Sequence, residues 1–300
     1  ALEDVEEAVN EARESLSNEL ERAKSSLESC AALLNALESE LDRYAALIPP
    51  NIMDILRSKS SELASMISDS IGKLNGMSLD AASKSLDAIV GDAKEEYDKI
   101  LEVAKSISSI LSILNEYRSL AESARRLSKL VEDWTPALED VDMDGIMDDL
   151  AKLARMGVVD QLNGIYADLS SKVRQARGSL TTGIERAREV MARYSNAARW
   201  LEAKAVMRAP IIDLGSVDQD GGERLDRLIK IKADVDAKLR EIAVKLNAPL
   251  SLIRYIAFKG PNVGIDEIEA GKSLGMESQQ VINYLEALWR AKLVEKKYVS

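Results

Sequence analysis

The sequence holds one run with the spacing of a metal site, which is Asp140-Val-Asp142-Met-Asp144-Gly145 followed by Asp148. Alternate carboxylates and a glycine open a calcium-binding loop, because the carboxylates converge on one ion and the glycine permits the sharp turn. The last ligand of such a loop is normally a bidentate Glu, and that position is Ala151 here. We therefore expect one of two things. Either calcium binds Asp140, Asp142, Asp144 and Asp148, or these residues form an acidic helix N-terminus without metal, favoured by the helix dipole.

No arrangement of a nucleophile with a base is visible. The chain has no histidine, so the Ser/His/Asp and Cys/His arrangements of hydrolases are excluded. The single cysteine, Cys30, occupies an apolar helix seam where a small buried residue is expected. The phosphate-binding loop G-x-x-x-x-G-K-S/T is also missing from the sequence. We expect a protein that is not an enzyme.

The composition limits the cellular compartment and the classes of partner that we expect. A lone cysteine cannot form an intrachain disulfide, so we expect a reducing compartment, the cytoplasm. No uninterrupted apolar run approaches about 18 residues, so no membrane span is expected. The net charge of -11 argues against unselective attraction of the whole chain to nucleic acid or anionic lipid. Ala1 fits either removal of an initiator Met or a start within a longer protein.

Apolar residues at helical spacing dominate the chain, while prolines and glycines are few. In the first segment the steps alternate three and four, apart from consecutive fours at Ala12, Leu16 and Leu20. This is a heptad seam with one stutter, and Pro49 with Pro50 ends it. The seam consists of Leu2, Val5, Val9, Ala12, Leu16, Leu20, Ala23, Leu27, Cys30, Leu34, Leu37, Leu41, Tyr44 and Ile48.

Two further long segments repeat the pattern over 78–131 and 160–207, with a short helix expected at 146–156 between them. Amphipathic helices of this length cannot bury their apolar faces alone, so they must pack on one another or on a partner chain. We expect a nearly all-α fold, an elongated antiparallel coiled-coil bundle that can also form a homodimer. The expected parts are this helical bundle (1–207), a loop or linker (208–222), a connecting helix (223–248) and a C-terminal domain (249–300).

The spacing of the apolar residues and the lengths of the predicted elements change after Pro249. The predicted elements are short helices at 250–258, 265–274 and 277–291 and a strand at 293–299. The residues that indicate these elements are the loop GPNVGIDEIEAGKSLG, the turn and helix MESQQVINYLEALWRAKLV and the final segment EKKYV. This order resembles the winged-helix family, the winged form of the helix-turn-helix. A three-helix fragment without that kinship is the alternative.

The resemblance implies binding of duplex DNA, with the third helix in the major groove. The contacting positions on that helix would be Ser278, Gln279, Gln280, Asn283 and Tyr284. Gln and Asn suit adenine edges, and Ser suits phosphate or either base. Lys296 and Lys297 would reach backbone phosphate from the wing. The family's wing is a hairpin, whereas only one predicted strand precedes Ser300 here, so we expect an open strand edge.

The charge balance of residues 250–300 argues against DNA binding. Residues 250–300 hold seven basic and six acidic side chains, which is a weak footprint for phosphate. Winged helices also dock proteins, and an open strand edge could take up a partner strand. We expect a scaffold or adaptor whose C-terminal module binds a partner protein. A DNA-binding transcriptional regulator or chromosome-associated protein is the alternative.

A second, more distant resemblance is to archaeal ESCRT-III-like division proteins, which also join a helical body to a C-terminal winged-helix-like element. Their membrane-facing first helices are basic. Residues 1–48 of this chain carry four basic and twelve acidic side chains, which an anionic leaflet would repel. No membrane partner is therefore expected.

Overall fold

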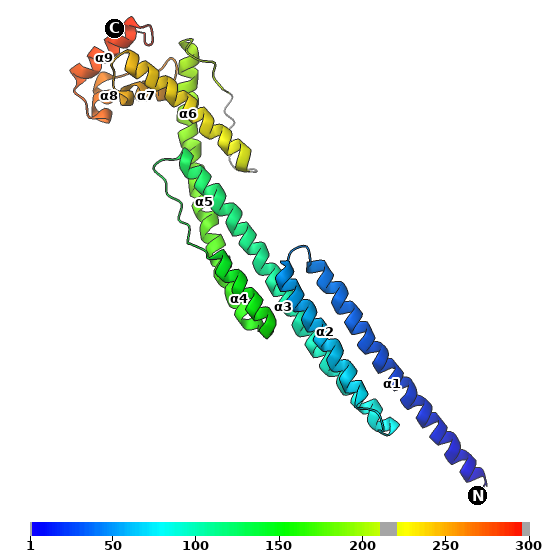
Figure 1. Cartoon of the computed structure of the whole chain (residues 1–300). Coiled ribbons are helices and arrows are strands. Elements are labelled where there is room, and N and C mark those ends of the chain that lie inside the picture. Colours follow the sequence, from blue (N-terminus) through cyan, green and yellow to red (C-terminus); the bar gives the residue numbers. More distant parts are fainter. Residues whose placement is uncertain (1, 211–220, 296–300) are drawn as a thin grey trace. The chain divides into compact units, whose positions relative to one another are not determined.

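The computed structural model describes residues 2–210 and 221–295, and this part of the chain is almost entirely helical (Figure 1). Within those ranges no strand occurs, so the all-α prediction is confirmed. None of the described helices combines the length and the apolarity that crossing a bilayer requires. The helices are α1 (Leu2–Tyr44), α2 (Pro50–Gly72), α3 (Leu79–Leu130), α4 (Met143–Met156), α5 (Val159–Ala203), α6 (Gly221–Lys245), α7 (Leu250–Lys259), α8 (Glu267–Leu274) and α9 (Ser278–Arg290).

The chain divides into two compact units. Unit 1 comprises residues 1–118 with 139–173, and unit 2 comprises residues 119–138 with 174–300. Helices α3 and α5 contribute residues to both units. The division thus falls inside two long helices, whereas the sequence analysis drew its boundaries at the breaks between helices.

Unit 1 is a helical bundle. Pro50 occupies the first turn of α2, where its missing N–H costs nothing, so the helix starts directly after the loop that reverses the chain. Helix α2 contacts both α1 and α4. The bundle is held by aliphatic burial, which is the main stabilising term for amphipathic helices. Its largest fully buried side chains are Leu37, Leu41, Ile52, Leu56, Ile107, Ile110, Leu150, Leu162 and Leu169.

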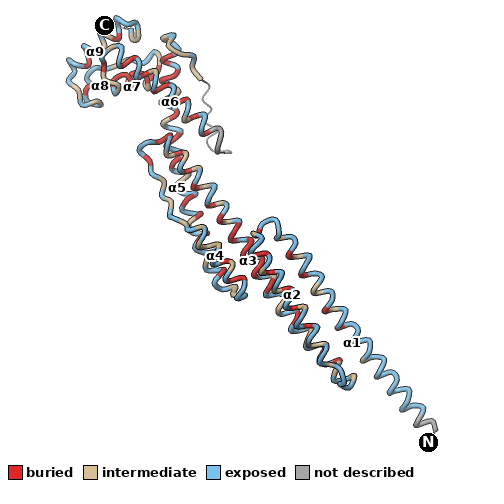
Figure 2. The backbone as a smooth tube through the Cα atoms, in the orientation of Figure 1, coloured by how far each residue is buried: buried red, intermediate tan, exposed pale blue. Residues whose placement is uncertain are grey.

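The N-terminal half of α1 differs from the rest of unit 1. From Glu6 to Ser25 no side chain is buried (Figure 2). Polar contact with α3 is made at Arg22 and Ser26, which both donate hydrogen bonds to Asp87. From Val9 to Leu27 the predicted heptad seam is exposed or half-buried, and from Cys30 to Ile48 it is buried or half-buried.

Unit 2 has one hydrophobic core, formed by the last turns of α3 and the second half of α5 together with α6 to α9. Val235 and Leu239 from α6 and Leu252 and Ile253 from α7 are completely buried in it. The C-terminal helices therefore share their core with α5 and α6.

A glycine shapes the edge of this core. The ring of Trp134, in the segment after α3, lies directly against Gly183 of α5. A Cβ atom at position 183 would lie 2.5 Å from Cη2 of Trp134 and 2.8 Å from a methyl carbon of Leu127. Only a residue without a side chain allows the indole to approach this closely.

The predicted strand after α9 is wrong in the part that the structure describes. Lys292 has a φ of 59°, and the N–H of Leu293 donates to the carbonyl of Leu288 at 2.9 Å, so α9 ends in a tight left-handed turn. Leu293 and Val294 then pack on the core of unit 2 instead of extending. Residues 296–299 of the predicted strand lie outside the described residues, and the wing stays a prediction.

Candidate functional site

The sequence places its candidate interaction residues on α9, which follows α8 after a turn of three residues. The turn is locally encoded. Asp266 starts α8 by accepting hydrogen bonds from the N–H groups of Ile268 and Glu269, both at 2.8 Å. Gly275 ends α8 with a left-handed φ of 64°. The result is two short helices joined by a turn of three residues.

A second glycine holds the two helices close together. The N–H of Met276 donates to the carbonyl of Gly271 at 2.9 Å. A Cβ atom at Gly271 would lie 2.8 Å from the carbonyl oxygen of Met276. The start of α9 is thus fixed against α8 by backbone contacts, which gives its outer face a defined orientation.

The first turns of the outer face of α9 carry uncharged polar side chains, and the exposed charges of Glu286 and Arg290 follow on the same stripe. Ser278, Gln279, Gln280 and Asn283 are exposed, and Tyr284 is half-buried because it packs against the core of unit 2. The Gln279 amide donates to the Asn283 side-chain oxygen at 3.3 Å, one helical turn away. We call these five residues the α9 face. Lys296 and Lys297, the remaining predicted contacts, lie outside the described residues.

Two basic side chains of α7 are engaged within the chain. Lys259 pairs with Glu269 at 3.0 Å and lies over the ring of Tyr255. The hydrogen bond from Lys259 lowers the pKa of Glu269, so that carboxylate is ionised at neutral pH. Arg254 pairs with Asp236 at 2.8 Å. Both cations are therefore already neutralised by intrachain carboxylates.

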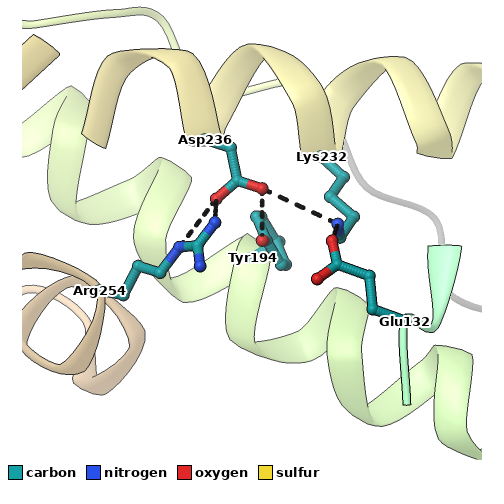
Figure 3. Close-up of polar contacts among 5 residues, drawn as sticks. All are labelled: Glu132, Tyr194, Lys232, Asp236 and Arg254. Atoms are coloured by element: carbon teal, nitrogen blue, oxygen red, sulfur yellow. Dashed lines mark hydrogen bonds and ion pairs between the residues drawn. The ribbon is translucent and has the colours of Figure 1, made fainter. Parts of the chain in front are cut away.

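The Asp236 pair belongs to a polar network inside unit 2 that the sequence analysis did not find (Figure 3). Asp236 is 7% exposed, in the middle of α6. One of its carboxylate oxygens accepts from Nε and Nη2 of Arg254, at 3.1 and 2.8 Å. The other accepts from the hydroxyl of Tyr194 at 2.7 Å and lies 3.8 Å from the ammonium of Lys232. Lys232 in turn contacts Glu132 at 2.5 Å.

The network joins α7 to α5 and α6 and reaches the segment after α3. Two further contacts act in the same place. The ring of Phe258 lies 5.1 Å from that of Tyr194, tilted by 59°. The Asn196 amide donates to the carbonyl of Phe258 at 3.1 Å, which satisfies the C-terminal end of α7. The first helix of the C-terminal module is thus attached to α5 by charge, hydrogen bond and ring contact.

The contacts of the network shift the pKa values of Tyr194, Glu132 and Arg254. Burial, then the hydrogen bond to Asp236, raise the pKa of Tyr194 well above its usual value, so the phenol stays a donor. The hydrogen bond from Lys232 lowers the pKa of Glu132. Burial works to lower the pKa of Arg254, but the bonds to Asp236 outweigh it and the pKa is raised. A network of this kind positions α5, α6 and α7 relative to one another.

One signal in the sequence could have revealed this network. Asp236 follows Val235 on the apolar stripe of α6, whose buried residues include Leu228, Ile231 and Leu239. A carboxylate on a buried helix face needs a cationic or hydrogen-bonding partner. Which partner it finds depends on the tertiary fold.

The predicted calcium residues lie in unit 1, in and just before α4. Asp142 is the N-cap of α4 and accepts from the N–H of Gly145 at 2.9 Å, which is the role of an acidic helix start. Asp140, Asp144 and Asp148 are exposed. In the described part of the chain no group of three or more Cys, Asp or Glu side chains could hold a metal ion. Calcium binding stays a prediction.

Comparison of the chain with protein-family models, with curated proteins and with solved structures found no match.

Proposed function

We propose that this protein is a non-enzymatic helical scaffold or adaptor that binds a partner protein through the α9 face. The observation that carries the proposal is the α9 face itself: exposed, uncharged amide and hydroxyl side chains on a helix whose support is rigid. Amide side chains offer donors and acceptors together. A face of this kind suits hydrogen-bonded recognition of a folded surface or a peptide backbone.

Electrostatics favour a protein over DNA as the partner. Specific DNA binders gain most of their affinity from lysine and arginine contacts with phosphate. In this module Arg254 and Lys259 are held by Asp236 and Glu269, which removes their charge from that task. Six acidic side chains also lie among residues 250–300, and they would repel a phosphate backbone.

The alternative function is sequence-specific DNA binding, and one observation favours it. The helix-turn-helix order of α8 and α9 presents Gln279, Gln280 and Asn283 on the second helix, and amides read adenine edges. In that case Lys296 and Lys297 would supply phosphate contacts next to the helix.

The test compares the full chain with two variants in proximity labelling followed by mass spectrometry. The first variant carries Gln279→Ala, Gln280→Ala and Asn283→Ala. The control carries Lys238→Ala and Glu241→Ala, which remove an exposed ion pair on α6. We expect one set of proteins to be recovered with the wild type and the control and lost with the α9 variant. Equal recovery from all three chains would reject the α9 face as the binding site.

A gel shift with random duplex DNA separates the two functions. At low salt we expect no retarded band with the wild type. A band that the α9 variant loses, and that weakens steeply as salt is added, would replace the scaffold proposal with the DNA alternative.

A further inference from the structure

An open row of large apolar side chains runs along the N-terminal half of α1. Val9, Leu16, Leu20 and Leu27 are 57%, 59%, 61% and 41% exposed. At about 3.6 residues per turn the four lie within roughly 40° of one another around the helix axis. We call them the α1 row. In Figure 2 this half of the helix is coloured as exposed.

The α1 row is distinct from the face that α1 uses inside unit 1. The buried residues Ser26, Cys30 and Leu37 lie on an arc turned by roughly 60° to 100° from the row. Leu27 shows the difference directly: its neighbour Ser26 is buried, while Leu27 itself stays 41% exposed. Intrachain packing therefore leaves the row uncovered even where α1 contacts α3.

A helix with this face exposed is incomplete. Helical segments without tertiary packing are marginal in water, because the conformational entropy of the backbone is not offset by apolar burial. Between Glu6 and Ser25 no side chain is buried. Regular leucine and valine spacing along such a segment is typical of a helix that pairs with another helix.

We propose that the α1 row pairs with the α1 row of a second copy of this chain, parallel and in register. The charges beside the row fit this arrangement. Glu19 lies about 80° to one side of the row, on the side of the arc that packs inside unit 1, and is half-buried there, while Lys24 lies about 60° to the other side, five residues later. In a parallel pair of helices, residues so placed face each other across the interface. Glu19 of each copy then meets Lys24 of the other.

The antiparallel arrangement is disfavoured by the same charges. Antiparallel pairing that stacks Leu16 on Leu20 of the second copy brings Arg13 opposite Lys24, because both lie on the same side of the row. Two cations would then face each other twice. In the parallel arrangement Lys24 faces a carboxylate instead, and two cations meet only once, where Arg13, one heptad before Leu20, faces Arg13 of the other copy.

Apart from Glu6, which lies about 60° from the row, most acidic side chains in this half of α1 lie away from the proposed interface. Glu7, Glu11, Glu14 and Glu21 lie at least about 120° from the row around the helix axis. They sit on the solvent side of a paired helix, where water and salt screen their repulsion. A pair of chains would also carry two α9 faces, which raises avidity for any partner with two sites.

Sedimentation equilibrium of the full chain tests the pairing. One variant carries Leu16→Glu and Leu20→Glu on the row. Its matched control carries Asn18→Glu and Ser25→Glu, which add the same charge on the opposite side of the same helix, where both residues are exposed. We expect a dimer for the wild type and the control. The row variant should raise the dimer Kd at least about 100-fold, because four leucines lose their burial.

Circular dichroism checks that the row variant still folds. The substituted leucines lie outside the cores of both units, so the row variant should keep the wild-type unfolding midpoint when both are compared as monomers. A wild type that stays monomeric up to about 100 µM overturns the proposal, since helix pairs of biological use are tighter than that. Equal Kd values for the row variant and the control overturn it as well.

A charge exchange tests the parallel register. Glu19→Lys alone places two lysine side chains opposite each other at each site, and Lys24→Glu alone places two glutamate side chains there, so each variant should form weaker homodimers. A mixed dimer of the two variants has two such sites. At one site the introduced lysine of one chain faces the introduced glutamate of the other, and the second site keeps the original pair of Glu19 and Lys24. We expect native mass spectrometry of the mixture to show mainly the mixed dimer. A statistical mixture, or no mixed dimer, would contradict the parallel register.

Discussion

One carboxylate oxygen of Asp236 accepts two hydrogen bonds from the guanidinium of Arg254, at 2.8 and 3.1 Å, inside the core of unit 2. Arg254 lies in the middle of α7, and Asp236 lies in the middle of α6. A buried carboxylate is tolerated when its lone pairs are satisfied and an opposite charge is adjacent. Tyr194 satisfies the second oxygen, so Asp236 meets both conditions.

Asp236→Ala should destabilise unit 2 by about 2 to 4 kcal/mol, because it leaves the Arg254 guanidinium and the Tyr194 hydroxyl without their acceptor in a buried place. All three tryptophans belong to unit 2, so tryptophan fluorescence during urea unfolding reports on this unit. The control is Glu241→Ala, which breaks an exposed pair with Lys238 on the same helix and should leave the urea midpoint almost unchanged. Similar losses in the two variants would mean that the Asp236 network contributes little.

Alkaline pH should weaken unit 2 through Tyr194. In the folded chain the pKa of Tyr194 is raised, by burial first and then by the bond to Asp236. The contribution of Tyr194 is complete below the pKa of an unfolded tyrosine, about 10, and is lost as pH rises above it, by up to about 1.4 kcal/mol per pH unit.

The measurement is urea unfolding at several pH values between about 8 and 11.5, a range that brackets the unfolded tyrosine pKa. Tyr194→Phe should unfold with a shallower pH dependence than the wild type, so the stability advantage of the wild type over this variant should shrink above about pH 10. Parallel pH profiles would show that Tyr194 does not titrate differently in the folded chain.

Gly183→Ala should destabilise unit 2 by about 1 to 3 kcal/mol, since the new methyl group overlaps the Trp134 ring. This loss outweighs the gain of up to about 1 kcal/mol that alanine brings to a helix. Gly178→Ala is the matched control on the same helix, because no atom lies within 4 Å of its Cβ position. The control should be slightly stabilising. A stabilised Gly183→Ala protein would contradict the close packing of Trp134.

Asp142→Ala should lower the stability of α4 by about 1 kcal/mol through loss of the N-cap. Asp142→Ser keeps a capping oxygen and should unfold almost like the wild type in circular dichroism. The pair of variants also addresses calcium. A rise in the wild-type unfolding temperature on adding calcium, absent in Asp142→Ser, would favour the metal loop over the cap alone.

Helix positions were predictable from sequence because their ends are encoded locally. Pro50 begins α2, and the left-handed Gly157 and Gly275 end α4 and α8, all at or within a few residues of the positions that the spacing predicts. The strand after α9 was not predictable in this way. Leu293 and Val294 read as strand residues, but their burial against the core decided their conformation.

The support of the candidate site could not be found from local patterns. Glu132, Tyr194 and Arg254 are distant in sequence from Asp236, and each has an ordinary surface or core interpretation when taken alone. Only the tertiary fold of unit 2 brings them within hydrogen-bonding distance. The α9 face, by contrast, follows from helical periodicity, which separates Val281 and Leu288 from the exposed amides.

The shared core of unit 2 limits how this protein can be taken apart. A chain cut before Leu250 would lose the aliphatic residues of α7. It would also leave the carboxylate of Asp236 without Arg254 in an apolar surface. The excised C-terminal piece would in turn uncover Leu252, Ile253 and Ile256, which are buried in the whole chain. We expect that neither fragment folds on its own, so fusions and truncations should keep residues 119–138 and 174–295 together.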